Sequence, residues 1–387
     1  MPLLNRAIEM QDEVSAWRRH LHQNPELLFD VHKTADFVAA RLRDFGCDSV
    51  ETGIGRTGVV GVIRGKEGEG RTIGLRADMD ALPIIELTNK PWASQDPGKM
   101  HACGHDGHTA MLLGAAQYLT ETRNFHGSVA VIFQPAEEGG GGGREMVEDG
   151  VMERFAISEV YGLHNMPGLG IGHFAICKGP IMAATDEFEI IVTGKGGHAA
   201  QPHVGVDPIV TASQLVMTLQ TIVSRGSNPL DSLVISVTKF HAGDAHNVIP
   251  EKVGLGGTVR TLLPAQRDFA ERRIRECASA IALAHGAMAE VSYRRNYPVT
   301  VNHDNETEFA VGVARAVAGN GAVNDAVQPM MGGEDFSYML EARPGAFIFM
   351  GNGDSAALHH AAYDFDDNAI PYGISYWVGI AETALAA

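Results

Sequence analysis

The sequence predicts an α/β protein with a mostly parallel sheet covered on both faces, and a smaller second domain inserted into it. In the first half of the chain, short apolar runs alternate with amphipathic segments, as strands and crossover helices do in parallel sheets. From about Ala184 the order becomes strand, helix, strand, strand, helix, strand, which is typical of ferredoxin-like modules. A chain of 387 residues also exceeds the usual size of one compact core.

The elements of the first domain follow from apolar periodicity. Ile8–Leu21 and Lys33–Phe45 have helical spacing and flank the turn-like sequence Asn24-Pro25-Glu26. Apolar runs bounded by glycine or charge predict strands, and the amphipathic segments between them predict helices. In chain order, the strands are Val59–Ile63, Thr72–Leu75, Ser128–Phe133 and Val160–Leu163, and the helices are Thr109–Leu119 and Gly143–Asp149.

The inserted domain is predicted to span residues 184–294, so that the first domain comprises residues 1–183 and 295–387. The same criteria place its strands at Glu187–Thr193, Ser232–Phe240, Lys252–Thr261 and Ala289–Tyr293, and its helices at Asp207–Ser224 and Pro264–His285. The chain then resumes the first domain with the helix Glu306–Ala318, the strand Ala346–Met350 and a closing helix near Ala369–Ala384.

Composition excludes several classes of function. A net charge of −17 argues against a nucleic-acid binder, which needs a basic face. The N-terminal residues lack the apolar core of a secretory signal, and no apolar run of 18 residues could span a membrane. The four cysteines lie far apart and show no disulfide spacing, which suits a reducing compartment. We therefore expect a cytoplasmic protein that interacts with neither nucleic acid nor membrane.

One short stretch has the composition of a metal site. A thiol and three imidazoles fall between His101 and His108, directly before the apolar segment that begins at Thr109. In the sequence Cys-Gly-His, Cys103 and His105 can both point inward from a tight loop before a helix, and both side chains bind Zn²⁺ readily. Taken alone, the stretch could also be a buried thiol beside surface histidines, so the hypothesis needs partners elsewhere.

Such partners follow three predicted strands. In parallel sheets ligands bind beyond the carboxyl ends of strands, and these positions hold Asp78 and Asp80, Glu137 and Glu138, and His164. Each could individually be a turn, cap or core residue; their joint position favours a site. Neighbouring residues on an extended segment point in opposite directions, so one glutamate could bind a metal while the other serves as general base.

Sulfur, nitrogen and oxygen donors are then sufficient for two divalent ions. The donor set is Cys103, His105, Glu138, His164 and one of His359 or His360. It is compatible with Zn²⁺, Mn²⁺, Ni²⁺ or Co²⁺. Neither a Gly-x-Ser-x-Gly elbow nor a phosphate-binding Walker loop is present in the sequence, so serine-hydrolase and nucleotide chemistry are not indicated.

These residues resemble a family of metal-dependent amidohydrolases and carboxypeptidases that includes hippurate hydrolase, auxin-conjugate hydrolases and N-acyl-amino-acid deacylases. The resemblance covers nearly the whole chain, from Arg18–Leu27 to the last helix. Its specific motifs are Leu75–Pro83, Met100–His108, Phe133–Glu138, Gly162–Asn165, Gly332–Phe336 and Leu358–His360. It implies a zinc-exopeptidase-like catalytic domain and an inserted lid or dimerisation domain in a homodimer or homotetramer.

The resemblance also implies roles for single residues. It makes Glu137 the general base and Asp80 the group that orients a ligand imidazole. His198 would hold the substrate carbonyl, in some relatives from a partner subunit, and Asn247 and Arg260 would bind the substrate carboxylate. The metal ligands would be Cys103, His105, Glu138, His164 and His359. Many relatives have proline after the paired histidines where this chain has Ala361-Ala362, so His360 remains the alternative ligand.

The function that the sequence predicts is hydrolysis of N-acyl-L-amino acids of the hippurate type, giving a carboxylic acid and a free amino acid. A carboxypeptidase, a dipeptidase or a deacetylase of the N-acetyl-diaminopimelate type is the alternative within enzymes. A metal-binding or peptide-binding protein without turnover is the alternative outside them, and the presence of both Glu137 and a full ligand set argues against it.

Overall fold

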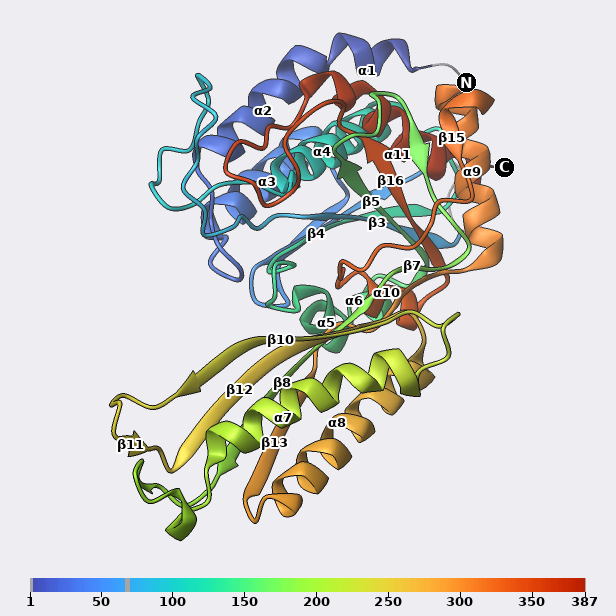
Figure 1. The fold of residues 1–387 in the computed structure, drawn as a ribbon. Helices are drawn as coiled ribbons and strands as arrows, with labels where there is room; N and C mark the ends of the chain where they lie inside the picture. Colours follow the sequence, from blue (N-terminus) through green and yellow to red (C-terminus); the bar gives the residue numbers. More distant parts are fainter. Residues whose placement is uncertain (1–2, 67–69, 387) are drawn as a thin grey trace. The chain divides into compact units, whose positions relative to one another are not determined.

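The computed structural model describes residues 3–66 and 70–386, which form two compact units (Figure 1). The larger unit comprises the described residues up to Ile181, Val301–Gln328, and those from Asp335 onward; the smaller comprises Met182–Thr300 and Pro329–Glu334. The last segment differs from the predicted division, which leaves it in the first domain. The segment Pro329–Glu334 joins the smaller unit because the Ala183 N–H donates to the Gly332 carbonyl at 2.8 Å.

The larger unit contains an eight-stranded mixed sheet with the order β1-β2-β4-β3-β5-β16-β6-β15. Its four central strands are parallel and almost entirely buried, and the strands β1, β2 and β6 pair antiparallel beside them. The α/β class with a parallel sheet core is therefore confirmed. The strands are β1 (Ser49–Ile54), β2 (Gly58–Arg64), β3 (Thr72–Asp78), β4 (Ser128–Gln134), β5 (Ile157–Met166), β6 (Phe174–Ala175), β15 (Val323–Asn324) and β16 (Gly345–Gly351).

Helices cover both faces of this sheet (Figure 1). One group packs around α4, which is buried along most of its length because small residues such as Gly107 and Gly114 admit Phe365 and Ile374. This group is α1 (Asn5–Glu9), α2 (Gln11–Gln23), α3 (His32–Phe45), α4 (His105–Thr122), α9 (Asp304–Ala318) and α11 (Ile370–Ala384). The other group is α5 (Gly142–Glu148), α6 (Val151–Arg154) and α10 (Ser337–Ala342).

Two helices differ from the prediction. The segment predicted as one helix over Ile8–Leu21 is divided at Met10 into α1 and α2. Helix α4 begins four residues before the predicted Thr109, because Gly104 takes a left-handed conformation with φ 89° and the chain becomes helical at His105. His105 and His108 thus lie on the first turn of a helix, not in a loop. Strand β1 was not predicted, since it lacks an apolar run and is largely exposed.

The smaller unit has the predicted β-α-β-β-α-β order. Its antiparallel sheet has the order β10-β12-β8-β13, and α7 and α8 pack on one face of it. Along β8, Phe188, Ile190 and Val192 are buried while the residues between them are exposed, which is the alternation of a half-buried strand. The elements are β8 (Ala184–Thr193), α7 (Pro208–Thr221), β10 (Leu233–Ala242), β12 (Lys252–Thr261), α8 (Pro264–Ala284) and β13 (Met288–Arg295).

The remaining elements are short and carry no clear apolar pattern, which is why the sequence did not predict them. They are β7 (Gly179–Met182), β9 (Gly197–His198), β11 (Val248–Ile249), β14 (Thr300–Asn302), the 3₁₀ turns Pro202–Val204, Asn320–Ala322 and Asp367–Ala369, and a π turn over Ile222–Gly226. Within the described part of the chain, no helix has the length and apolarity needed to cross a membrane. All four cysteines are free thiols.

Candidate metal centre

Three of the predicted metal ligands lie at or beyond the carboxyl ends of parallel strands, while Cys103 and His105 lie at the start of α4. Strands β4, β3 and β5 are adjacent, and Asp78 at the end of β3 pairs with Gln134 at the end of β4. The Glu137–Glu138 turn follows β4, and His164 lies near the end of β5. His359 comes from the loop after β16, where its N–H donates to the Ala102 carbonyl at 2.8 Å. Parallel pairing therefore gathers residues that are far apart in the chain.

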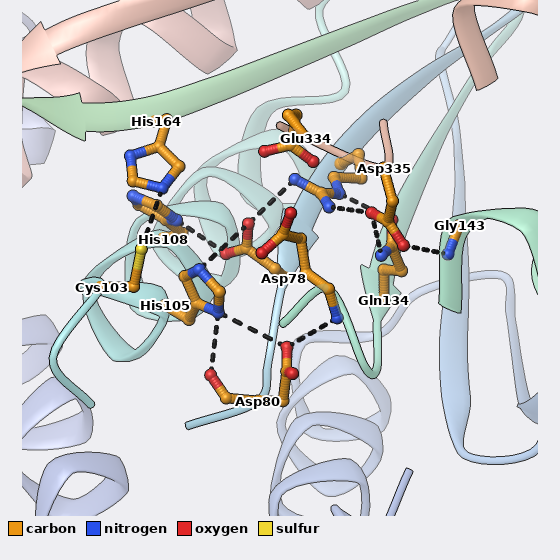
Figure 2. A network of polar contacts seen from close by, with 12 residues as sticks. Asp78, Asp80, Cys103, His105, His108, Gln134, Gly143, His164, Glu334 and Asp335 are labelled. Atoms are coloured by element: carbon orange, nitrogen blue, oxygen red, sulfur yellow. Dashed lines mark hydrogen bonds and ion pairs between the residues drawn. The ribbon is translucent and has the colours of Figure 1, made fainter. Parts of the chain in front are cut away.

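All five predicted ligands and Glu137 belong to one cluster, part of which Figure 2 shows. Cys103 Sγ lies 3.4 Å from His164 Nε2, and His359 Nε2 lies 3.2 Å from Glu138 Oε1. Potential ligand atoms come within 4.8 Å of one another in five groups of the described residues. Three overlapping groups consist of predicted ligands and Glu137: Cys103 with His105 and His164, Cys103 with Glu138 and His359, and His105 with Glu137 and Glu138. The other two are Asp78 with His105 and His108, and Glu137 with Glu334 and Asp335. Since the groups share members, the cluster suits two ions with common ligands.

The orientation of the imidazoles fits cation binding. His105 Nδ1 lies 2.8 Å from the Asp80 carbonyl oxygen, which can only accept, so Nδ1 carries the proton. His105 Nε2 is buried and has no hydrogen-bond partner among the described residues. His164 Nδ1 donates to the Asn165 carbonyl at 2.7 Å, which leaves its Nε2 toward Cys103. His105 Nε2 also lies 3.7 Å from Asp78 Oδ2. A buried ring nitrogen without a hydrogen bond, beside a thiol and carboxylates, is a suitable ligand for a divalent metal.

Asp80 contacts both the His105 imidazole and the turn that carries the two glutamates. It orients the His105 imidazole chiefly through its main-chain carbonyl, while its carboxylate oxygen Oδ1 is 3.5 Å from the ring nitrogen. The carboxylate instead accepts the N–H groups of Glu137 at 2.9 Å and Glu138 at 3.1 Å. These two glutamates lie in a turn after Ala136, whose φ is 54°, so the prediction of an extended segment is wrong. Asp80 holds this turn.

Burial and neighbouring charges set the protonation states in the cluster. Burial, with Glu138 and Glu137 nearby, raises the pKa of the Cys103 thiol well above its usual value. Burial alone would lower the pKa of His105, but Asp78 and Asp80 raise it to about 10. Burial and His108 lower the pKa of His164, which is therefore neutral, as a metal ligand must be. Cation binding would displace protons from Cys103 and His105, so metal affinity should increase with pH.

The two adjacent histidines after β16 have different surroundings. His359 adopts a left-handed conformation with φ 63°, which is unfavourable for a residue with a side chain, and its imidazole pairs with Glu138. Burial would raise the pKa of Glu138, but His359 and His105 lower it. His360 Nδ1 accepts the Ala362 N–H at 3.0 Å, and His360 joins none of the potential ligand groups in the described residues. This geometry supports His359 as the ligand.

His198, Asn247 and Arg260 all lie in the smaller unit. His198 on β9 pairs with Val248 on β11, and the Ala199 N–H donates to the Asn247 carbonyl at 3.0 Å, so His198 and Asn247 are neighbours. Arg260 lies near the far end of β12, where its guanidinium donates to Thr258 Oγ1 and to the Val259 carbonyl. The strand segment from Lys252 to Arg260 is about 27 Å long at the usual rise per residue. The structure therefore does not bring Arg260 to His198 and Asn247.

Behind the cluster lies a buried ion network that the sequence did not reveal (Figure 2). The Arg76 guanidinium donates to Asp78 at 2.9 Å, to Asp335 at 3.0 Å and to Gln134 at 2.9 Å. Asp335 also accepts the Gly143 N–H at 2.8 Å. Burial would raise the pKa of Asp78, but its cationic neighbours hold it well below the usual value. The network ties the ends of β3 and β4 and the start of α5 to Asp335 in the segment before α10.

A second buried pair supports the helix that carries His105. His22 Nδ1 lies 2.8 Å from Asp106 Oδ2, and Arg18 Nη1 lies 3.6 Å from the same oxygen. Burial would lower the pKa of His22, but Asp106 raises it to about 9. Arg18 and His22, both in the Arg18–Leu27 motif, thus stabilise the start of α4 through Asp106. Sequence spacing could not indicate this contact, because the two segments are 84 positions apart.

Comparison with known proteins gives consistent matches. A model of peptidase family M20/M25/M40 matches residues 74–383. A hippurate hydrolase of Campylobacter jejuni is 41% identical over 381 residues, covering 98% of this chain and 99% of the relative. An N-acetyl-L-cysteine deacetylase of Bacillus subtilis is 42% identical over 363 residues, covering 93% and 85%. The crystal structure of a dinuclear metal binding peptidase from the M20 family of Bacillus subtilis superimposes with a TM-score of 0.85 at 35% identity, covering 98% and 99%.

Proposed function

Because the chain belongs to peptidase family M20/M25/M40, we propose that it hydrolyses the amide bond of N-acyl-L-amino acids, as its hippurate hydrolase relative is named for doing. The products would be a carboxylic acid and a free amino acid. The observation that carries the proposal is the cluster itself, in which five potential ligands from three strand ends and the start of α4 lie in groups that also include Glu137. Such a cluster provides both a metal centre and a base for hydrolysis.

We propose that Cys103, His105, Glu138, His164 and His359 hold two divalent metal ions. An M20 structure at 35% identity is that of a dinuclear metal binding peptidase. When bound, such ions polarise a carbonyl and lower the pKa of water. The mixed donor set admits Zn²⁺, Mn²⁺, Ni²⁺ or Co²⁺, and metal supply decides among them.

Glu137 would serve first as general base and then as general acid. Its main chain is held by Asp80, and its carboxylate belongs to a ligand group with His105 and Glu138. From this position it can take a proton from the attacking water and deliver it to the departing amide nitrogen. The two transfers leave Glu137 in its starting state, so one carboxylate suffices for the cycle.

The substrate would be held by residues of the smaller unit. A guanidinium is suited to a planar carboxylate, so we propose that Arg260 binds the amino acid carboxylate together with Asn247, while His198 binds the substrate carbonyl. Within one chain, Arg260 is separated from Asn247 and His198 by most of the length of β12. This separation favours a site in which Arg260 comes from one subunit and the other two residues come from another. We therefore propose a homodimer or homotetramer in which His198 and Asn247 complete the site of a partner, with the smaller unit as lid and dimerisation domain.

Replacing His198 by alanine should lower turnover while metal content stays normal. If His198 acts across subunits, mixed dimers of His198→Ala and Glu137→Gln chains should regain activity, since one of the two sites then contains both intact residues. That site should restore about half of the wild-type rate per dimer. The measurement is turnover of mixed dimers isolated with two different affinity tags. Mixed dimers as inactive as both parents would show that His198 acts within its own chain.

A substrate panel tests the proposed activity. The purified protein should be analysed for bound metals and assayed with benzoyl-glycine, acetyl-amino acids, N-acetyl-diaminopimelate and a dipeptide. We expect turnover of acyl-amino acids that a chelator abolishes and added metal restores. Preference for the dipeptide would indicate a carboxypeptidase or dipeptidase, and metal binding without any turnover would indicate a binding protein.

The free cysteines are consistent with the cytoplasmic location that we propose.

A further inference from the structure

We propose that Asn165 is a positioning residue that clamps the Cys103 loop to its neighbours and thereby sets the affinity of the metal centre. The inference rests on the proposed metal-dependent function and extends it to residues outside the ligand set. Asn165 directly follows His164 on β5 and is completely buried. Its contacts reach three separate elements, each of which carries or adjoins a potential ligand.

The side-chain amide of Asn165 has a partner for each of its polar atoms. Its Nδ2 donates to the Cys103 carbonyl at 2.6 Å and lies 3.0 Å from His108 Nε2, whose single lone pair also accepts the Asn165 main-chain N–H. Its Oδ1 accepts the hydroxyl of Tyr363 at 2.8 Å. Asn165 therefore joins the Cys103 loop, the first turn of α4 and the loop after β16 through a single group.

The main chain of Asn165 completes the arrangement. Its carbonyl accepts the proton of His164 Nδ1 at 2.7 Å, and its N–H donates to His108 Nε2 at 2.9 Å. Because an N–H can only donate, His108 Nε2 is unprotonated, and Nδ1 donates to Asp78 Oδ1 at 2.7 Å. Both nitrogens of His108 are thus engaged. His108 forms a potential ligand group with Asp78 and His105, but because both its nitrogens are engaged we assign it to the support and not to the ligand set.

Gly104 provides the space for this clamp. A β-carbon at residue 104 would lie 2.2 Å from Asn165 Nδ2 and 2.4 Å from the Tyr363 hydroxyl, far inside van der Waals contact. The left-handed φ of 89° at Gly104 also turns the chain from Cys103 into α4. The short, side-chain-free connection lets Asn165 approach the Cys103 carbonyl closely, so the direction of the adjacent thiol depends on this hydrogen bond.

The position of Cys103 matters for both proposed ions, because its sulfur belongs to two of the five potential ligand groups. Without the Asn165 amide, the Cys103 carbonyl and the Tyr363 hydroxyl would be buried without their partner, and the loop would shift to satisfy them. Supporting hydrogen bonds of this kind change metal affinity by about 10–100-fold when removed. We expect Asn165→Ala to weaken metal binding by a factor in that range.

The test measures Zn²⁺ affinity of the full-length chain by competition with a chromophoric chelator, without any substrate. Asn165→Ala should bind Zn²⁺ about 10–100-fold more weakly than the wild type, and Tyr363→Phe should bind it more weakly by a smaller factor. In the Asn165→Ala background, Tyr363→Phe should have little further effect, because the hydroxyl acts through the amide. Excess Zn²⁺ should restore turnover in both variants with an unchanged KM.

Asn302 provides a matched control. It is equally buried in the same unit, and its side chain also bonds to main-chain groups, those of Cys177 and Phe347, none of which belongs to a potential ligand. Asn302→Ala should lower thermal stability but leave Zn²⁺ affinity of the folded protein unchanged. Equal Zn²⁺ affinities for wild type and Asn165→Ala, or equal losses for Asn165→Ala and Asn302→Ala, would overturn the inference. A wild type that binds no Zn²⁺ would instead contradict the proposed function.

Discussion

Glu137→Gln is expected to lower turnover of N-acyl amino acids by about 10²–10⁴-fold while metal content remains near that of the wild type. Glutamine has nearly the same shape, and the Glu137 N–H would still donate to Asp80, so the turn should persist. The amide cannot accept a proton from water at neutral pH, and the chemical step should therefore fail. The measurement combines kcat under saturating substrate with elemental analysis of the same preparation.

The neighbouring residue supplies the matched control for this prediction. Glu138→Gln changes the same functional group one position away, but Glu138 pairs with His359 and is a proposed ligand, so this variant should lose metal. Comparing metal content and turnover of the two variants should thus distinguish the general base, Glu137, from the metal ligand, Glu138. An unchanged rate in Glu137→Gln would remove that residue as the base, and loss of metal in it would indicate that the roles of the two glutamates are exchanged or shared.

Cys103→Ala is expected to reduce the metal content from about two ions per chain to about one or fewer, with a corresponding loss of turnover. The sulfur belongs to two ligand groups and lies 3.4 Å from His164 Nε2, so its removal deprives the centre of a central donor. Elemental analysis after dialysis against a weak chelator measures the stoichiometry. Far-ultraviolet circular dichroism should show that the variant remains folded.

Cys177→Ala serves as the control for general effects of removing a buried thiol. Cys177 is also a buried free cysteine of the larger unit, but it belongs to none of the potential ligand groups of the described chain. It should retain normal metal content. Normal stoichiometry in Cys103→Ala would contradict the ligand role of Cys103 and would require that the other donors hold both ions.

Much of the fold follows from local pattern. Strand β8 alternates buried and exposed residues, and the buried strand β4 has a continuous apolar run from Val129 to Phe133, so their positions could be predicted from sequence. Strand β3 was predicted only as far as Leu75, because its last residues include the charged Arg76 and Asp78. The start of α4 could not, because its first turn contains His105, Asp106 and His108, which do not show an apolar period. Those residues are helical because the helix is packed on nearly every side and its polar first turn is paired within the protein.

The sequence by itself determined the chemistry of the site: a thiol, imidazoles and paired carboxylates stand after strands that, when parallel, end at one edge of a sheet. Only the tertiary structure decided how these groups are held. Asp80 holds the glutamate turn, Arg76 joins Asp78 to Asp335, and Asn165 clamps the Cys103 loop. All three are contacts between segments that are distant in the sequence. Sequence spacing carries no signal for them, because hydrogen-bond direction depends on side-chain positions that exist only once the sheet is assembled.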